Sequence, residues 1–319
     1  MDANTVTELK KTLNFTPKSG TRFSHFWKFR WLYVFMIPGL LYFFVFKYMP
    51  MWGLIMAFKN YRPHLGIMQS EWVGFAHFER FFSLPDFWML FRNTLLLALY
   101  DLVIFFPLTI LMAIMLNEIR KEWFKKSVQT IVYIPYFLSW VVIVGITHIL
   151  LSVEGGVVTE MLSQFRSNPV DFLTSPDWFR PLIVMQMVWK DAGWGTIIFL
   201  AALAGVNTQL YEAARLDGAN RFRLIWHITL PSIRNIIVIL LILRLGNFLD
   251  LGFEQIFLMV NSLNREVGEV FDTYVYRTGL VQGQFSYSAA VGLFKAAVGL
   301  VLVMGANWIA KKFGEEGLY

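Results

Sequence analysis

The chain has 319 residues, of which 56% are hydrophobic and only 16% are charged, and its formal net charge is +6. Soluble domains carry about 25% charged residues, so this composition excludes both an ordinary soluble globule and a disordered chain. The absence of cysteine excludes a disulfide framework, thiol catalysis and thiolate metal sites.

Six segments are apolar and long enough to cross a bilayer, which takes about 20 mostly apolar residues per helix. In chain order they are Trp31–Met51, Asn93–Leu116, Val128–Leu151, Pro181–Ala204, Ile233–Leu251 and Tyr287–Ala310. The first lacks a small-residue cleavage site and is too long for a signal peptide, so we expect it to remain as a helix. Pro107 and Pro135 are expected to kink their helices. The fold class is therefore predicted to be an all-α integral membrane protein with six transmembrane helices.

Lys and Arg are distributed unevenly among the loops. Residues 1–30 hold six of them, and the short loop after the second predicted helix holds four, whereas the loops after the third and fifth hold two each. Cytoplasmic loops of membrane proteins collect Lys and Arg, so both termini are predicted to be cytoplasmic. Residues 1–30 and 311–319 are then cytoplasmic tails, and residues 31–310 form the transmembrane domain.

Two of the outer loops are predicted to be partly structured. The aromatic-rich stretch Asn60–Arg92 predicts one or two short interfacial helices, because its charges argue against burial in lipid. The loop Gly252–Ser286 mixes apolar and charged residues, and we expect it to fold back against the helices.

The cytoplasmic loop at residues 205–232 has the most specific pattern. It predicts a helix over Leu210–Leu216, a stop at Gly218, and a second helix over Arg221–His227 that ends before Pro231. A helical hairpin at the membrane surface is suited to docking into a groove of a partner protein. The helical pattern alone favours a plain amphipathic surface loop equally well.

The residue types and spacing of this loop resemble the signature loop of binding-protein-dependent ABC importer permeases. The matching positions are Glu212, Ala213, Ala214, Gly218, Ile228, Leu230 and Pro231. Other stretches resemble the sugar permeases that carry oligosaccharides or polysaccharide fragments, and the resemblance covers residues 30–312. These stretches include Lys47–Pro50, Gly74–Phe82, Arg92–Leu95, Tyr133–Pro135, Trp189–Gly195, Asp272–Arg277 and Ala289–Lys295. Unlike the maltose-type permease, the sequence shows no additional N-terminal spans or large outer domain.

The resemblance implies a type I ABC importer permease core in the cell membrane, with several partners. The expected partners are a second homologous permease, two copies of a separate ABC ATPase, an extracytoplasmic solute-binding protein and membrane lipid, and no nucleic acid. The residues implied to couple this chain to the ATPase are Glu212, Ala213, Ala214, Asp217, Gly218, Leu230 and Pro231. The sequence contains no Gly-x4-Gly-Lys-[Ser/Thr] loop, so we expect no ATPase activity, no cofactor bound by this chain, and ATP and Mg on the partner ATPase.

Polar residues within the predicted helices are candidates for the substrate path, because ionisable groups in a membrane are costly and mark functional sites. The first group is Trp189, Lys190, Asp191 and Trp194, in which aromatic faces would stack on a sugar ring and polar groups would bind its hydroxyls. The second group is Asn247, Asp250, Glu254 and Gln255, whose spacing places the first three on one helical face.

The sequence also allows purely structural roles for these polar residues. The first group also fits a Lys190–Asp191 pair buried for packing or two interfacial tryptophans, and the second fits a solvated helix end. Arg244 is a candidate partner of Asp250, and Asp101 of Lys295. Acidic groups on the path favour a neutral or cationic sugar, whereas Lys190 and Arg244 favour an anionic one, so the charge of the cargo stays undecided.

Two other functions compete with the importer. A membrane-embedded glycosyl or lipid-linked sugar transferase would need clustered acidic metal ligands or a catalytic histidine, and the sequence shows neither an Asp-rich repeat nor a His-x-x-x-His motif. An ion-coupled carrier would show inverted repeats and more spans. The five histidines have no metal-ligand spacing, so no metal site is predicted.

Overall fold

A computed structural model describes residues 27, 29–165, 170–250 and 252–312. The described residues fall into two compact units, which divide between Leu54 and Ile55. Most of the two predicted cytoplasmic tails, and Leu251 at the end of the fifth predicted helix, lie outside the described residues.

The first unit contains one long helical segment. Helix α3 (Arg30–Phe43) continues through a π-helical turn, η1 (Phe44–Tyr48), into α4 (Met49–Met51). Pro38 lies inside α3 without ending it. With the 3₁₀ segment η2 (Trp52–Phe58), the helical run Arg30–Phe58 is apolar and long enough to cross a membrane, in agreement with the first predicted span.

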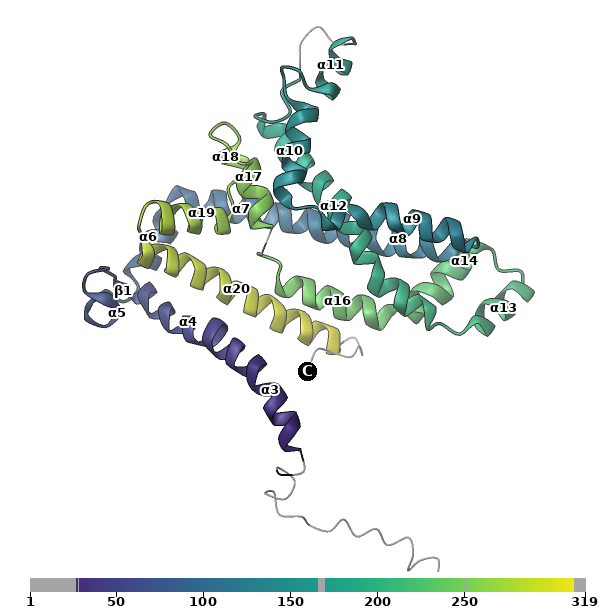
Figure 1. The fold of residues 1–319 in the computed structure, drawn as a ribbon, viewed down its shortest axis with the longest axis horizontal. Coiled ribbons are helices and arrows are strands. Elements are labelled where there is room, and N and C mark those ends of the chain that lie inside the picture. Colours follow the sequence, from purple (N-terminus) through teal and green to yellow (C-terminus); the bar gives the residue numbers. More distant parts are fainter. Residues whose placement is uncertain (1–26, 28, 166–169, 251, 313–319) are drawn as a thin grey trace, which may run out of the picture. The chain divides into compact units, whose positions relative to one another are not determined.

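Three further candidate spans are continuous helices in the second unit (Figure 1). All three extend beyond the predicted segments, because the polar residues at their ends still continue the helix. The elements are α7 (Pro85–Tyr100) with the π-helical turn η3 (Asp101–Phe105) and α8 (Phe106–Glu118), then α12 (Pro176–Ala204), then α20 (Phe285–Lys312).

The third predicted span is not a straight helix. It consists of α9 (Glu122–Tyr133) and the 3₁₀ segment η4 (Ile134–Phe137), followed by α10 (Trp140–Leu151) at an angle of 99°. The bend follows Pro135, which lacks a backbone N–H. Ser139 then begins α10 by accepting a hydrogen bond from the backbone N–H of Val142.

The fifth predicted span is shorter than expected and follows a sharp bend. Helix α16 (Arg234–Gly246) meets the preceding helical run at 63°, so the structure has four continuous candidate spans, or up to six if each bent pair is one span. The preceding run is α14 (Arg221–Leu224), η5 (Ile225–Thr229) and α15 (Leu230–Ser232). Contrary to the sequence prediction, Pro231 does not follow the end of a helix. It lies within this run, near the start of α15, where its missing N–H is tolerated.

The connecting segments contain short elements, in agreement with the predicted structure of the outer loops. A small antiparallel pair of strands near the aromatic-rich stretch, β1 with β2, is an addition that the sequence did not predict. The short elements are β1 (Lys59–Asn60), α5 (Gly66–Gln69), β2 (Glu71–Trp72), α6 (Ala76–Ser83), α11 (Val157–Ser163), α17 (Phe253–Met259), α18 (Arg265–Gly268), α19 (Phe271–Tyr276) and η6 (Arg277–Val281).

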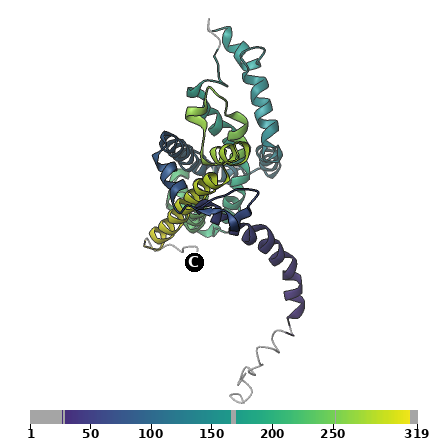
Figure 2. The ribbon, with the colours of Figure 1, turned by 90° about the vertical axis from the view of Figure 1, so that its left-hand side faces the viewer.

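Helix α12 is central in the second unit. It packs against α8, α9 and α18, while α16 packs along α20 (Figures 1 and 2). In lipid, helix association depends on close packing more than on the hydrophobic effect, and small residues allow it. At Gly193, a Cβ atom would lie 2.2 Å from the carbonyl oxygen of Val132 in α9, so only glycine fits this crossing.

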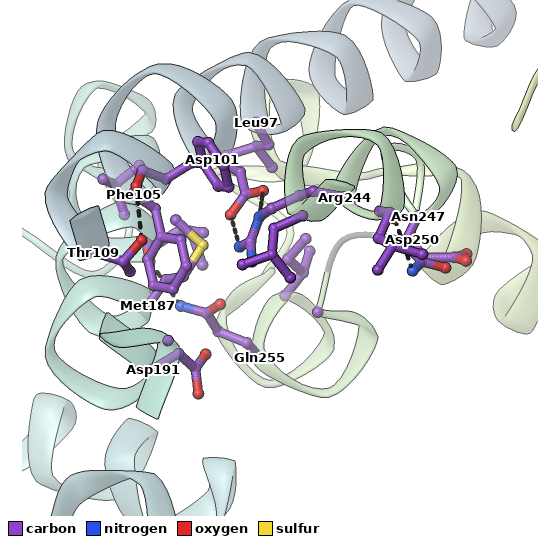
Figure 3. Close-up of a pocket in the computed structure, with 18 of the residues that line it drawn as sticks. Leu97, Asp101, Phe105, Thr109, Met187, Asp191, Arg244, Asn247, Asp250 and Gln255 are labelled. Atoms are coloured by element: carbon purple, nitrogen blue, oxygen red, sulfur yellow. Dashed lines mark hydrogen bonds and ion pairs between the residues drawn. The ribbon is translucent and has the colours of Figure 1, made fainter. Parts of the chain in front are cut away.

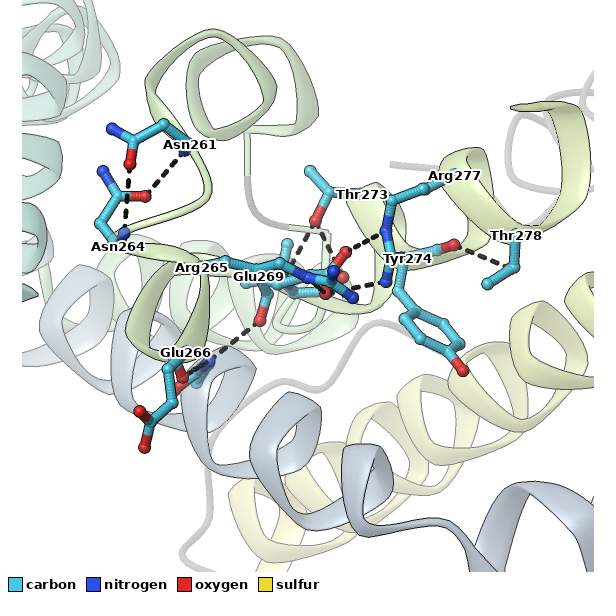
Figure 4. Close-up of polar contacts among 11 residues, drawn as sticks. Asn261, Asn264, Arg265, Glu266, Glu269, Thr273, Tyr274, Arg277 and Thr278 are labelled. Atoms are coloured by element: carbon cyan, nitrogen blue, oxygen red, sulfur yellow. Dashed lines mark hydrogen bonds and ion pairs between the residues drawn. The ribbon is translucent and has the colours of Figure 1, made fainter. Parts of the chain in front are cut away.

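The segment that contains α18 and α19 is held by a buried carboxylate (Figure 4). Glu269 is 2% exposed and accepts hydrogen bonds from Arg265 (2.7 Å) and from two nitrogens of Arg277 (2.8 and 3.0 Å). Its backbone oxygen accepts a hydrogen bond from Asn93 in α7. The predicted folding of the loop Gly252–Ser286 against the helices is therefore confirmed.

Candidate functional site

A polar cavity of about 460 Å³ lies among α7, η3, α8, α12, α16 and α17 (Figure 3). Its volume is within the range of about 300–1,000 Å³ that is common for small-molecule sites. Among the described residues, the charged and polar side chains that line it are Asp101, Thr109, Asp191, Arg244, Asn247, Asp250 and Gln255. The cavity therefore gathers charged and polar side chains among largely apolar ones, and most of them lie on candidate membrane spans.

An ion pair between two candidate spans forms one wall of the cavity. The Nε atom of Arg244 lies 2.5 Å from Oδ2 of Asp101, and its Nη2 atom pairs with Oδ1, so the guanidinium binds the carboxylate with two nitrogens. The side chain of Asp101 is 14% exposed and that of Arg244 is 35% exposed. Two-nitrogen pairing of this kind fixes geometry as well as charge, so the pair joins η3 to α16 firmly.

A second ion-paired group adjoins the first cavity. A smaller cavity of about 260 Å³ shares Asp250 with it and is also lined by Asp272 and Lys295. The ammonium group of Lys295 pairs with both carboxylates, and its side chain is 12% exposed. Lys295 therefore ties α20 to the segment that follows α16 and to α19.

The two predicted pairings, Arg244 with Asp250 and Asp101 with Lys295, are wrong because the partners are exchanged. The prediction assumed one continuous helix through residue 251, with Asn247, Asp250 and Glu254 on one face. Instead, α16 ends at Gly246 and the next helix begins at Phe253. After the break, Asp250 lies beside Lys295 of α20.

The motif Trp189-Lys190-Asp191-x-x-Trp194 does not gather at the cavity, and of its four named residues only Asp191 lines it. Lys190 is 8% exposed and donates hydrogen bonds to the backbone oxygens of Tyr136 (2.8 Å) and Leu138 (2.5 Å), at the bend before α10. Consecutive residues of an α-helix point about 100° apart, because there are ~3.6 residues in a turn. Lys190 and Asp191 therefore face different surroundings, and no Lys190–Asp191 ion pair is formed.

The two tryptophans lie at the surface of the described chain. Trp189 is 47% exposed and Trp194 is 44% exposed. The ring of Trp194 stacks on that of Tyr136, with centroids 4.3 Å apart and an interplanar angle of 3°. One face of this tryptophan is thus occupied by a ring of the same chain.

The residues of the second predicted group also do not all line the cavity. Asn247, Asp250 and Gln255 line the cavity, whereas Glu254 is exposed outside it. Gln255 is 3% exposed and donates to the backbone oxygen of Ile183 (2.9 Å) and to Oε1 of Gln186 (3.0 Å). Gln255 thereby connects α17 to α12 as well as lining the cavity. Sequence reasoning did not place Thr109 here, and it assigned Asp101 and Arg244 to other partners.

The predicted helical hairpin is present between α12 and α16. Helix α13 (Thr208–Leu216) is capped by the side chain of Asn207, and α14 by that of Asn220. Between them, Gly218 has a φ of +79°, a left-handed conformation that glycine adopts without strain. The hydroxyls of Tyr211 and Thr229 are 3.0 Å apart and link the first helix to the run that follows the second.

The hairpin exposes both charge and apolar surface. Glu212, Ala213, Asp217 and Gly218 are exposed, and Ala214 is half-buried. Leu216 is 90% exposed and Phe222 is 83% exposed, on either side of the turn. Large apolar side chains grouped on a surface are typical of an interaction site.

Three features of this chain are typical of a membrane transport subunit: a cavity lined by charged side chains, helices long enough to cross a membrane, and an exposed helical hairpin. Residues 105–315 match the family of the binding-protein-dependent transport system inner membrane component, and the chain belongs to this family. The prediction of an ABC importer permease is therefore confirmed.

Relatives and solved structures agree with this assignment. Protein LplB of Bacillus subtilis is 57% identical over 290 residues, which cover 91% of each chain. The polygalacturonan/rhamnogalacturonan transport system permease protein YteP of the same organism is 57% identical over 290 residues, 91% of this chain and 90% of that one. A chain in the crystal structure of a bacterial alginate ABC transporter, in complex with an alginate pentasaccharide-bound periplasmic protein, is 40% identical with a TM-score of 0.85 and covers 92% of this chain and 99% of that one.

These findings give no support to the membrane-embedded transferase. The matched family consists of transport components, and the described residues contain no group of three or more His, Asp or Glu side chains that could hold a metal ion. The structure is mostly helical and has the type I ABC permease fold, with four to six candidate spans.

Proposed function

We propose that this chain is the membrane-spanning subunit of an ATP-driven importer that moves an oligosaccharide or a polysaccharide-derived sugar from an external binding protein into the cytoplasm. The observation that carries the proposal is the polar cavity of about 460 Å³ among helices of membrane-spanning length. Names of the relatives support the cargo class, because they refer to polygalacturonan/rhamnogalacturonan and to alginate.

The cavity provides groups that suit a saccharide. Asp191 and Asp250 offer carboxylate oxygens that accept hydrogen bonds from sugar hydroxyls, and Asn247 offers an amide that both donates and accepts. Lys190 and Glu254 have no place on this cavity. The exposed faces of Trp189 and Trp194 belong in our proposal to a surface completed by another subunit.

The hairpin is the proposed contact with the ATPase. Glu212, Ala213, Ala214, Asp217 and Gly218 form its first helix and turn, and Leu230 and Pro231 end the helical run that returns to the membrane. The exposed side chains of Leu216 and Phe222 support this role, because a partner's groove would cover them. ATP and Mg belong to the ATPase, and this chain has no ATPase site of its own in the proposal.

The complete transporter would contain a second homologous permease, two ATPase subunits and an extracytoplasmic binding protein. Each bent helix pair counts as one span, which gives six spans with both termini in the cytoplasm. Residues 31–310 form the transmembrane domain, between the tails 1–30 and 311–319. Nucleotide binding shifts the permease pair between inward-facing and outward-facing states only as far as its affinities for the two states differ.

The proposal is tested by ATP hydrolysis of the reconstituted transporter, with its binding protein and a panel of oligosaccharides. We expect a saccharide-loaded binding protein to stimulate hydrolysis, and Glu212→Ala to reduce that stimulation at least fivefold. The matched control is Glu122→Ala, since Glu122 is also an exposed carboxylate and lies in the first turn of α9.

Two results would contradict the proposal. If the purified chain retains no ATPase, the hairpin is not a coupling site. If Glu122→Ala reduces the stimulation as much as Glu212→Ala, the effect is one of surface charge and not of a specific contact.

A further inference from the structure

The turn between α8 and α9 lies where two candidate membrane helices meet. Only Ile119, Arg120 and Lys121 separate the end of α8 from the start of α9 (Figure 1). Helix α8 ends one candidate span, and α9 begins the bent pair that counts as another. A bilayer around these helices would therefore place this turn at the level of the lipid headgroups.

The turn and the first residues of α9 carry basic side chains that the chain itself does not neutralise. Residues 118–126, which we call the basic turn, contain the carboxylates Glu118 and Glu122 and the cations Arg120, Lys121, Lys125 and Lys126. Among the described residues, no ion pair or side-chain hydrogen bond involves any of these four cations. By contrast, Arg244, Arg277 and Lys295 each bind a carboxylate of the chain. Three of the four cations of the basic turn are exposed, and Lys125 is half-buried.

Large apolar side chains are exposed directly beside these cations. Trp123 is 67% exposed and Phe124 is 47% exposed, and their ring centroids are 5.7 Å apart. Two turns further along α9, Ile131 is 69% exposed. Exposed tryptophans are typical of the level at which a membrane protein meets the headgroups, and exposed aliphatic residues beyond them are typical of contact with acyl chains.

The two hydroxyl residues on this side of α9 make their hydrogen bonds within the helix. Ser127 and Thr130 are exposed, but the hydroxyl of Ser127 donates to the backbone oxygen of Trp123, and that of Thr130 donates to the backbone oxygen of Lys126, both at 2.9 Å. Lipid offers no partners for polar groups, so a protein must satisfy them internally. The exposed side of α9 thus meets the requirement for contact with acyl chains, and it has cations at its start.

Resting on the topology that belongs to the proposed function, we propose that the basic turn binds an anionic phospholipid of the cytoplasmic leaflet. The phosphate lies beside the exposed cations, and the acyl chains follow the exposed side of α9. Clusters of Lys and Arg at the cytoplasmic end of a span attract anionic headgroups. An acidic protein segment would need the charge but not the apolar side chains that follow it, whereas a phospholipid joins a charged head to apolar tails in this same order.

The test uses the complete transporter in nanodiscs of phosphatidylcholine. The chain contains no cysteine, so Ser127→Cys places a single thiol-reactive fluorophore on the exposed side of α9. The transporter without this substitution gives the background from the other subunits. A minor fraction of the lipid carries brominated acyl chains, which quench nearby fluorophores, on either phosphatidylglycerol or phosphatidylcholine. We expect the phosphatidylglycerol to quench the fluorophore at least threefold more than the phosphatidylcholine does.

The double variant Lys121→Gln/Lys126→Gln removes two exposed cations and keeps long polar side chains. Each Lys near an anionic surface strengthens binding about fivefold, so the preference for phosphatidylglycerol should disappear. The matched control is Lys311→Gln/Lys312→Gln, which removes the same charge from two exposed residues at the end of α20. The control should keep the preference, and so should Lys121→Arg/Lys126→Arg.

The inference is overturned if the two brominated lipids quench equally, or if Lys311→Gln/Lys312→Gln abolishes the preference as completely as Lys121→Gln/Lys126→Gln. It is also overturned if neither lipid quenches the fluorophore in the complete transporter, because another subunit would then cover α9. The comparison of the two lipids needs no charge variant to fold, and Thr130→Cys provides a second position for the fluorophore.

The proposed function can fail separately from the lipid site. Binding-protein-stimulated ATP hydrolysis is measured in the same nanodiscs, and stimulation without a lipid preference would refute the lipid site alone. Loss of stimulation with a lipid preference would refute the importer and leave the lipid site in place. Labelling of Lys121→Cys in intact cells by a membrane-impermeant thiol reagent would place the basic turn outside, and would refute the topology on which the inference rests.

Discussion

Replacing the buried Glu269 is predicted to open the segment that contains α18 and α19. Its side chain is 3% exposed and accepts three hydrogen bonds, one from Arg265 and two from Arg277 (Figure 4). The substitution Glu269→Gln removes the negative charge and places an amide donor against two guanidinium groups. The arginines would then face each other without a counter-charge.

The free-energy cost of Glu269→Gln depends on how deeply the carboxylate and its two arginine partners are buried. Removing one partner of a buried ion pair typically costs about 3–5 kcal/mol. The side chains of Arg265 and Arg277 are 41% and 30% exposed, so water rehydrates them in part and the cost should be reduced. We expect about 2–3 kcal/mol for Glu269→Gln, which is a change of about 30- to 150-fold in an equilibrium constant.

The arginine variants should fall in a fixed order. Arg277→Gln removes two of the three hydrogen bonds and should cost about 2 kcal/mol, because a hydrogen bond to a charged group contributes ~1.5–3 kcal/mol and the 30% exposed Arg277 side chain already contacts water in part. Arg265→Gln removes one bond and leaves the other two in place. It should therefore cost about 1 kcal/mol, near the value of an exposed ion pair.

Amide hydrogen exchange of α18 and α19 measures this local opening directly. Faster exchange is expected in the order Glu269→Gln, Arg277→Gln, Arg265→Gln. The control is Glu266→Gln, because the neighbouring Glu266 side chain is exposed and makes no hydrogen bond among the described residues. Equal acceleration by Arg265→Gln and Glu269→Gln would refute the reasoning, as would less than a threefold change for Glu269→Gln.

Three other predictions concern single positions. Gly193→Ala should sharply reduce the yield of monodisperse protein on gel filtration, because its Cβ would lie 2.2 Å from a backbone oxygen of α9. The control Gly292→Ala should behave as wild type, since a Cβ at Gly292 would meet nothing within 4 Å. Equal yields of the two variants would refute the close crossing at Gly193. Gly218→Ala should destabilise the hairpin by about 1–2 kcal/mol and Gly218→Asn by less, as read from amide exchange of α13, since only the backbone conformation opposes a side chain there. Hydrogen bonds from Thr174 hold the pKa of Asp171 below its ordinary value of 3.8. The turn that these bonds form should therefore persist above about pH 4 and be lost as the pH falls through the lowered pKa. NMR chemical shifts of the turn that stay constant from pH 6 to pH 2 would contradict this.

Hydropathy was enough to locate the candidate spans, because the requirement for about 20 apolar residues acts on each segment alone. The structure of the signature loop also depends mainly on residues close together in the sequence. Gly218 lies within a few positions of the helices it separates, so the first helix and the turn were predicted to within two residues, whereas the second helical run continues through Pro231 to Ser232. Features that depend only on neighbours along the chain were therefore readable from the sequence.

Side-chain direction was not readable in the same way. The Trp-Lys-Asp-x-x-Trp motif looked like one site because its residues are adjacent, but adjacent helical residues diverge by about 100°. Lys190 turned to the carbonyl oxygens at a bend that hydropathy did not show, and Asp191 turned to the cavity. The sharp bend after Pro135 created the acceptors that the lysine needed.

The partners of the intramembrane charges depended on where a single helix ends. Arg244 and Asp250 are six residues apart, about 1.7 helical turns, so the predicted pair would have been poorly aligned even if α16 had continued past Gly246. Because the helix stops there, Asp250 reaches Lys295 and leaves Arg244 to Asp101. The same break thus sets which carboxylate each of the two cations binds, so the end of one helix decides how the charges around the cavity are paired.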